Sequence, residues 1–309
     1  MILSLFGLAG GIGMPMQTSI NAQLGKRMGS PFIAAMLNFM IGLGALLIIT
    51  SIWEHGLAIP VGAIMAAPPW ILMGGMLAVV FVTGNILLMP RIGSVQTAIL
   101  PAMGQIFMGT LIDTFGLFES HQRDLTPLRL VGVGLVIAGV LTVILAKAGS
   151  AGLRKKPTET VSHVWLWRAF GLIIGMCMAS QTAVNSHLGI VTDSRLFASV
   201  INFTVGTTLL IVLNIILWRT KKPGNRSEKA PFWIWTGGLF GVLFVVGNII
   251  AAQTVGTGMA VVILLTGLMI GGLLVDRFGL FRSARRPVGK REILGVFIMI
   301  CGAALFHLA

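Results

Sequence analysis

Apolar residues fill this sequence in runs long enough to cross a lipid bilayer, and this feature limits the possible folds more than any other. Of the 309 residues, 56% are hydrophobic and only 10% are charged. A water-soluble protein of this size needs a more charged surface, whereas a membrane-spanning helix needs about 20 predominantly apolar residues. We therefore expect an all-α membrane protein that crosses the bilayer many times.

Ten segments of the required length can be placed along the chain. They lie near residues 2–23, 31–53, 70–90, 93–113, 129–147, 165–187, 195–218, 233–252, 255–276 and 292–308. No basic residue precedes the first segment, so we expect it to remain as a helix and not to be cleaved as a signal peptide.

The two halves of the chain carry the same polar residues in the same order. The matched pairs are Gln17 and Gln181, Thr18 and Thr182, Asn21 and Asn185, Asn38 and Asn202, Asn85 and Asn248, and Asp113 and Asp276. The offset is 164 residues in the first two helices and 163 residues afterwards. Chance similarity between apolar helices would not keep this register. We predict two five-helix repeats, at residues 1–148 and 165–309, joined by a basic cytoplasmic linker at 149–164.

The loop charges predict that the second repeat is inverted. Five is an odd number of helices, so the second repeat must enter the membrane from the opposite side. Of the 22 Lys and Arg residues, all but Arg123, Arg129 and Arg195 fall on the side that holds the linker. Because Lys and Arg accumulate in cytoplasmic loops, we expect both termini on the extracytoplasmic side. An inverted repeat of this kind is typical of secondary transporters with alternating access.

Three short patterns resemble those of a known family. Q-T-x-x-N-x-x-L-G begins at Gln17, A-x-x-x-N-F-x-x-G contains Asn38, and Gly84-Asn85 follows late in the third helix. Together they resemble the bacterial YdcZ-like family of the drug/metabolite transporter superfamily, in its fused antiparallel form. The resemblance covers essentially the whole chain. It implies a ten-helix bundle that exports or imports small metabolites, without naming a substrate and without catalytic residues.

Carboxamide side chains lie inside the predicted helices, where lipid offers them no hydrogen bonds. By depth we expect two clusters, with Gln17, Asn21, Asn38 and Asn85 in the inner half of the bilayer and Gln181, Asn185, Asn202 and Asn248 in the outer half. Unpaired amides in hydrocarbon cost on the order of several kcal/mol, so these residues must face protein or water. Two interpretations stay open: gates along a substrate pathway, or hydrogen bonds that hold each half together.

Two residues break the repeat symmetry. Pro15 removes a backbone donor inside the first helix, and its counterpart is Ala179. It predicts a hinge, although proline is also tolerated in membrane helices. Gln105 lies near the middle of the fourth helix and has Leu268 as its counterpart. A substrate is rarely symmetric, so we expect Gln105 to contribute to substrate choice.

No charged residue lies in the middle of a predicted helix. Asp113 and Asp276 stand at helix ends, where we expect them at the lipid headgroups, with a proton or cation role as the alternative. We expect His187 to be a surface histidine. The five histidines show no ligand spacing, so we predict no metal and no cofactor.

The sequence favours a secondary transporter, most simply an exporter, of small neutral or zwitterionic organic metabolites in the bacterial inner membrane. A passive channel for small neutral polar solutes is the alternative. We expect no enzyme, because no nucleophile and base share a depth. Partners should be a small-molecule metabolite and the lipid bilayer, with proton or ion coupling left open and no oligomer required. The net charge of +13 follows from loop topology and does not predict nucleic-acid binding.

Overall fold

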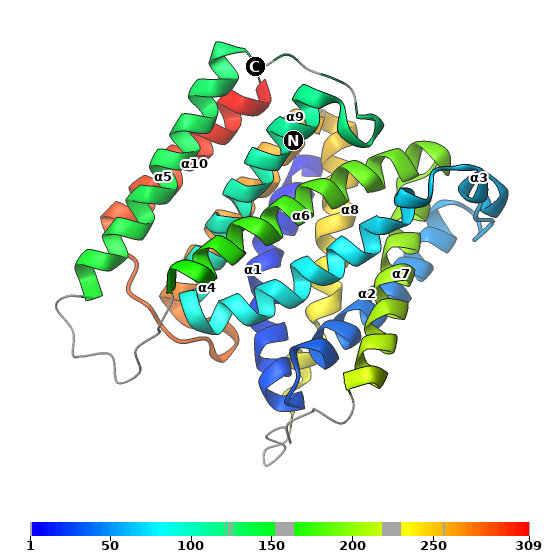
Figure 1. Cartoon of the computed structure of the whole chain (residues 1–309). Helices are drawn as coiled ribbons and strands as arrows, with labels where there is room; N and C mark the ends of the chain where they lie inside the picture. The colour runs from blue at the N-terminus through cyan, green and yellow to red at the C-terminus, as the bar shows by residue number, and fades with distance from the viewer. Residues whose placement is uncertain are drawn as a thin grey trace.

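The computed structural model describes residues 2–120, 122, 124, 126–151, 164–217, 230–255 and 257–308. Every regular element in these ranges is helical (Figure 1). The α-helices are α1 (Ile2–Met28), α2 (Pro31–Trp53), α3 (Val61–Ala66), α4 (Met73–Phe115), α5 (Pro127–Ala151), α6 (Val164–Val191), α7 (Arg195–Ile216), α8 (Gly237–Val255), α9 (Thr257–Phe278) and α10 (Lys290–Leu308). Most of the predicted linker at 149–164 lies outside the described residues.

Helix α4 contains two of the predicted spans. Its path is interrupted at Gly93, which has φ 83° and ψ 171°. Glycine adopts this left-handed region without steric strain, so the break falls where the sequence permits it. The predicted helices near 70–90 and 93–113 are therefore the two arms of α4. The short α3 and the 3₁₀ turn η1 (Pro69–Leu72) precede them.

Serine caps define where two corresponding helices begin. The Oγ of Ser30 accepts a hydrogen bond from the backbone N–H of Ile33, 3.4 Å away, at the start of α2. The Oγ of Ser194 accepts from Leu196 and Phe197, both at 3.2 Å, at the start of α7. A serine oxygen at this position satisfies N–H groups that have no partner within the helix.

The helices pair across the two halves of the sequence. Helix α1 packs against α8 and α9, α4 packs along α6, and α2 packs against α7. Helices α5 and α10 lie side by side at one edge of the bundle (Figure 1). Most helix pairs thus join residues more than 100 positions apart, and the core lies between the two halves.

Glycines permit the closest crossings. A Cβ at Gly11 of α1 would overlap the carbonyl oxygen of Leu264 in α9. A Cβ at Gly175 of α6 would likewise overlap the carbonyl oxygen of Pro101 in α4. Gly175 is 164 residues after Gly11, and Leu264 is 163 residues after Pro101. Small residues let helix backbones approach closely in lipid, where no hydrophobic force draws helices together.

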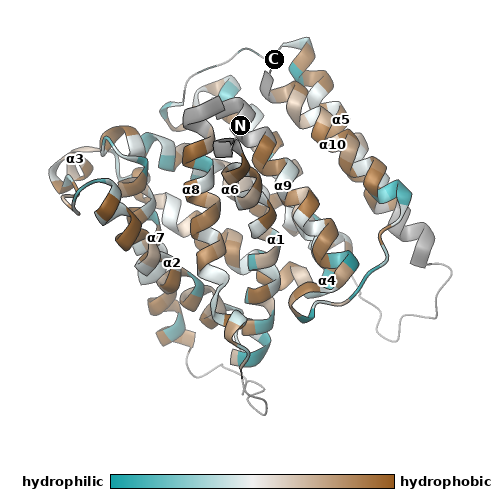
Figure 2. Ribbon diagram, turned by 180° about the vertical axis from the view of Figure 1, so that it is seen from behind, coloured by the Kyte–Doolittle hydropathy of each residue, from teal (hydrophilic) through white to brown (hydrophobic). Residues whose placement is uncertain are grey.

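The outer faces of the helices are apolar. Large exposed side chains on α2 and α7 include Ile48, Ile52, Ile215 and Ile216. Figure 2 shows hydrophobic residues along the helix faces and hydrophilic residues mainly near helix ends. Within the described residues, four helical stretches are long and apolar enough to cross a membrane: Pro31–Trp53, Pro69–Phe115, Val164–Val191 and Arg195–Ile216.

Candidate functional site

Three carboxamides of the first half form a hydrogen-bonded group, which we call the first triad. Gln17 and Asn21 lie one turn apart on α1, and Asn38 lies on α2. The Nε2 of Gln17 and the Nδ2 of Asn21 each donate to the Oδ1 of Asn38 over 3.0 Å. All three side chains are buried. The triad therefore ties α1 to α2 inside the protein and does not face lipid.

The first triad packs against the start of α8, in the other half of the chain. A Cβ at Gly237 would overlap the Oδ1 of Asn21 and would lie 3.2 Å from the Oδ1 of Asn38. The hydrogen bonds lie within the first half, but the packing joins that half to the second. The first triad therefore contributes to contacts between the halves as well as within the first half.

Gln181, Asn185 and Asn202 form a second triad with a similar position and different bonding. A Cβ at Gly74, near the start of α4, would overlap the Oδ1 of Asn185 and would lie 3.1 Å from that of Asn202. The side-chain oxygens of all three residues are buried without a hydrogen-bond partner among the described atoms. The two triads match in placement, but only the first has an amide oxygen that accepts hydrogen bonds, the Oδ1 of Asn38; the Oδ1 of Asn21 has no partner among the described atoms.

Asn85 and Asn248 do not join the triads as the sequence suggested. Asn85 is buried on α4 and lines a void of about 20 Å³ together with Pro15 and Thr18. A cavity needs about 10–15 Å³ to hold one water molecule, so this void has no room for a solute. Asn248, on α8, lines a much larger cavity.

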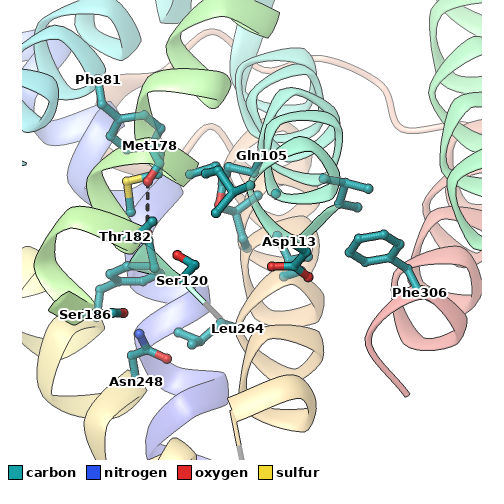
Figure 3. A pocket seen from close by; sticks show the side chains of 18 of the residues that line it. Phe81, Gln105, Asp113, Ser120, Met178, Thr182, Ser186, Asn248, Leu264 and Phe306 are labelled. Atoms are coloured by element: carbon teal, nitrogen blue, oxygen red, sulfur yellow. Dashed lines mark hydrogen bonds between the residues drawn. The ribbon is translucent and has the colours of Figure 1, made fainter. Parts of the chain in front are cut away.

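That main cavity has a volume of about 280 Å³ and lies between the two halves. Figure 3 shows Gln105, Thr182, Ser186 and Asn248 as its uncharged polar side chains, together with Ser120. Its apolar wall includes Met14, Phe81, Met178, Phe244 and Phe306. Thr182 and Ser186 are exposed although they line the cavity, so the cavity is open. The lining suits a small amphipathic molecule with hydrogen-bonding groups.

The structure places Gln105 in this cavity, half-buried, and its role in substrate choice stays a prediction. Thr182 and Ser186 were not predicted as lining residues. Thr182 belongs to the repeated motif and Ser186 follows one turn later on the same face, which is the signal that could have found them. No sequence pattern marks Phe81 and Phe244 as cavity residues, because a phenylalanine that lines a cavity and one that faces lipid look the same in an apolar helix.

An ion pair borders the main cavity. The Nη2 of Arg129 donates to the Oδ2 of Asp113 over 2.7 Å, and its guanidinium lies 4.8 Å from the ring of Phe306. Arg129 is 2% exposed, and Asp113 lines the cavity. Asp113 therefore bonds to a protein group while its side chain stays 29% exposed, and its expected place at the headgroups stays a prediction. The bordering ion pair is compensated, which favours a solute without net charge.

Asp276 is also buried, with 1% of its surface exposed. Its Oδ1 and Oδ2 accept hydrogen bonds from the backbone N–H groups of Ser94, over 3.0 Å, and Val95, over 3.2 Å. These residues follow the break at Gly93, so the carboxylate caps the second arm of α4. Asp276 is therefore not exposed to headgroups as the sequence suggested, because it is enclosed by protein and its carboxylate binds backbone N–H groups.

Pro15 lies within α1, which continues as a helix on both sides of it. It borders the small void beside Asn85. The hinge stays a prediction.

His187 is largely buried and not a surface histidine. Its Nε2 lies 3.5 Å from a carboxylate oxygen of Glu119, and its ring lies 5.1 Å from that of Trp70. In the part of the chain that the structure describes, no three His, Cys, Asp or Glu side chains are grouped to hold a metal ion.

Comparison with known proteins adds a family and a fold. The sequence profile of a family described as “Putative inner membrane exporter, YdcZ” matches residues 2–142 and 166–305. “Inner membrane protein YdcZ” of Escherichia coli (strain K12) is 29% identical over 140 residues, which are 44% of this chain and 87% of that protein. A solved structure titled “Crystal structure of protein” has a TM-score of 0.60 at 12% identity, covering 98% of this chain and 94% of the other. At this identity the likeness concerns the fold alone.

Proposed function

This chain belongs to the YdcZ family of inner membrane proteins, and on that premise we propose that it exports small organic metabolites across the bacterial inner membrane as a secondary transporter. The family description and the apolar helices support transport over catalysis. Both halves of the machinery lie in one chain, so the proposal requires no oligomer. The coupling of transport to protons or other ions stays open.

The proposed architecture is a pair of inverted five-helix repeats at residues 1–148 and 165–309. The family profile matches two segments whose starts are 164 residues apart and whose ends are 163 residues apart, as the sequence register predicts. The E. coli relative matches over 87% of its own length but only 44% of this chain, which fits one repeat. The paired glycine crossings of α1 with α9 and of α6 with α4 support the same proposal.

One observation supports alternating access above the others: the space between the halves is largest at one end, and only a smaller pocket of about 90 Å³ lies at the other end, beside Gln23 and Asp276. The main cavity measures about 280 Å³, while the void beside Asn85 and Thr18 measures about 20 Å³. A passive channel would need a path past both. Under the proposed topology the main cavity faces the extracytoplasmic side, and the first triad lies on the closed cytoplasmic side.

The predicted site residues take the following roles in this proposal. Gln105 and Asn248 contact the solute in the main cavity. The first triad, with Asn85 next to it, is part of the closed inner gate, and the second triad, whose oxygens are unpaired, belongs to the outer gate. Pro15 is the hinge beside the inner gate. The solute is small, net neutral and amphipathic, to match a mixed lining with a compensated ion pair.

A variant that fills the cavity provides the direct test. Gly109 lines the cavity, and a Cβ there would meet no atom within 4 Å. Gly109→Leu should therefore occupy solute space without disturbing the packing. Gly134 on α5 is the matched control, because it is equally unobstructed and does not line the cavity.

Metabolite profiles of cells with and without the protein should identify a solute, whose flux is then measured in proteoliposomes. We expect Gly109→Leu to reduce flux at least about tenfold and Gly134→Leu to leave it unchanged. Gradient-driven accumulation above equilibrium distinguishes a transporter from a passive channel. Equal flux in both variants would contradict the proposed pathway.

A further inference from the structure

Two turns of the chain share one local structure. The turns follow α4 and α9, where Asp113 and Asp276 begin matched D-x-F-G-L-F stretches. Gly116 and Gly279 have φ of 62° and 64°. The phenylalanine two residues after each glycine also has positive φ and packs on a tryptophan, with ring centroids 5.8 Å apart in the first turn and 5.4 Å in the second. The two turns thus have the same backbone conformation and the same Phe–Trp contact.

The second turn, η5 (Leu280–Arg282), is docked onto α1. The Oγ of Ser19 donates to the carbonyl oxygen of Leu280 over 3.2 Å and contacts the Oγ of Ser283. The Nε2 of Gln23 donates to the carbonyl oxygen of Arg282 over 3.0 Å. Asp276, at the base of this turn, caps the arm of α4 that begins after Gly93. These contacts hold the second turn and α9 against α1 and α4, beside a pocket of about 90 Å³.

The first turn, η2 (Leu117–Glu119), stands beside the open cavity. Ser120 and Ala183 are the counterparts of Ser283 and Ser19, and both line the main cavity. Asp113 binds Arg129 over 2.7 Å. Ser94 and Val95, whose N–H groups bind Asp276, correspond to Thr257 and Gly258, the first residues of α9.

We propose that Asp276 and Asp113 are alternating latches, an inference that rests on the proposed inverted repeats. Asp276 holds the inner side closed by capping α4. When the main cavity closes, Asp113 leaves Arg129 and caps the start of α9, while Ser120 approaches Ala183. The start of a helix carries partial positive charge and unpaired N–H groups, so each carboxylate stabilises the closed form of its own side.

The two latches differ in their competing partner. At the position that corresponds to Arg129 the second half has Glu292, which is buried and accepts a hydrogen bond from the N–H of Gly289 over 2.9 Å. Glu292 cannot pair with Asp276 as Arg129 pairs with Asp113, and the basic residues beside Asp276, Lys26 and Arg286, come from other positions of the fold. Under this proposal the asymmetry favours the docked second turn on the inner side and the open main cavity on the outer side.

Cysteine cross-linking in membranes tests the latches. The native Cys177 and Cys301 are first replaced by alanine, and a protease site is inserted between residues 152 and 163 so that only cross-linked halves remain joined after cleavage. The inner reporter pair combines Ser19→Cys with Ser283→Cys. The outer pair combines Ser120→Cys with Ala183→Cys. Disulfide formation is followed over time under a mild oxidant.

We expect both pairs to cross-link, each reporting its own closed side. Asp276→Asn should slow the inner pair about tenfold, the scale of a lost charge-assisted hydrogen bond, and accelerate the outer pair. Arg129→Gln should accelerate the outer pair and Asp113→Asn should slow it. In the variant that combines Arg129→Gln with Asp113→Asn, the outer pair should cross-link as slowly as it does with Asp113→Asn alone. Because the two sides alternate, Arg129→Gln should slow the inner pair and Asp113→Asn should accelerate it, and formation of the inner disulfide in both variants shows that they fold.

An outer pair that never forms, or one whose rate ignores Asp113→Asn, would overturn the latch. If solute flux persists in that case, the proposed function stands without it. Conversely, normal cross-linking with no flux of any profiled metabolite would overturn the proposed function and leave the latch in place.

Discussion

Identical residues at corresponding positions do different things in the two halves. Asn38 accepts two hydrogen bonds, whereas the Oδ1 of its counterpart Asn202 accepts none from the described residues. Both are buried. The contribution of a carboxamide to stability depends on whether its partners lie within reach, so the two asparagines form a natural matched pair.

We predict that Asn38→Leu lowers the free energy of unfolding by about 1–3 kcal/mol, because it leaves the buried donors of Gln17 and Asn21 unpaired. Asn202→Leu should change it by about 1 kcal/mol or less. Denaturant unfolding of the purified protein in detergent measures both. Equal destabilisation by the two substitutions would show that the first triad contributes no special stability.

Residue accessibility provides a second matched pair. Thr18 and Thr182 both donate to the carbonyl oxygen four residues earlier, over 3.0 and 2.9 Å. Thr182 lines the open cavity, whereas Thr18 lines the small void. In a background without native cysteines, we expect a membrane-impermeant maleimide to label Thr182→Cys at least about tenfold faster than Thr18→Cys. Comparable rates from either side of the membrane would argue against one-sided access.

At the scale of helices, the bundle depends on backbone contact at a few crossings. The crossing of α6 with α4 leaves no space for a Cβ at Gly175. The crossing of α5 with α10 has two such close contacts, because Gly132 faces Gly302 and Gly139 faces Gly295. Glycine usually weakens a helix, so its presence at these positions reflects packing between helices.

Gly175→Ala should therefore destabilise the protein by about 1–3 kcal/mol through overpacking. Gly134→Ala meets open space and should be neutral or stabilising by up to about 1 kcal/mol, as expected for alanine in a helix. The comparison is made by thermal unfolding in detergent. Similar melting temperatures for the two variants would mean that α4 and α6 can separate without loss.

At the scale of the molecule, the two halves have the same parts in two different arrangements. One side combines bonded carboxamides, a docked turn and a capped helix; the other combines unpaired amide oxygens, a cavity and an ion pair. Exchange of these arrangements between the halves would move the opening to the other side. The Gly109→Leu and latch experiments test this exchange independently.

The sequence alone determined the helices, the register between the halves and the family, because hydrophobic length and the spacing of polar residues are local properties. Residue count also placed Gln105 near the middle of its predicted helix, because each residue adds a fixed rise along the helix axis. The sequence placed a boundary between residues 90 and 93, but only the structure showed the break at Gly93 and the two arms as one element.

Only the tertiary structure decided which polar residues meet. Asn85 and Asn248 lie apart from the triads. Asp276 caps α4, and Asp113 pairs with Arg129. The contact of Asp276 with α4 joins residues more than 100 positions apart in the sequence. The contact of Asp113 with Arg129 depends on how the end of α4 is oriented toward the start of α5. Two copies of one motif have the same local preferences, so the sequence cannot say which copy is bonded. Packing between the halves makes that choice, because it sets which partners lie within reach of each copy.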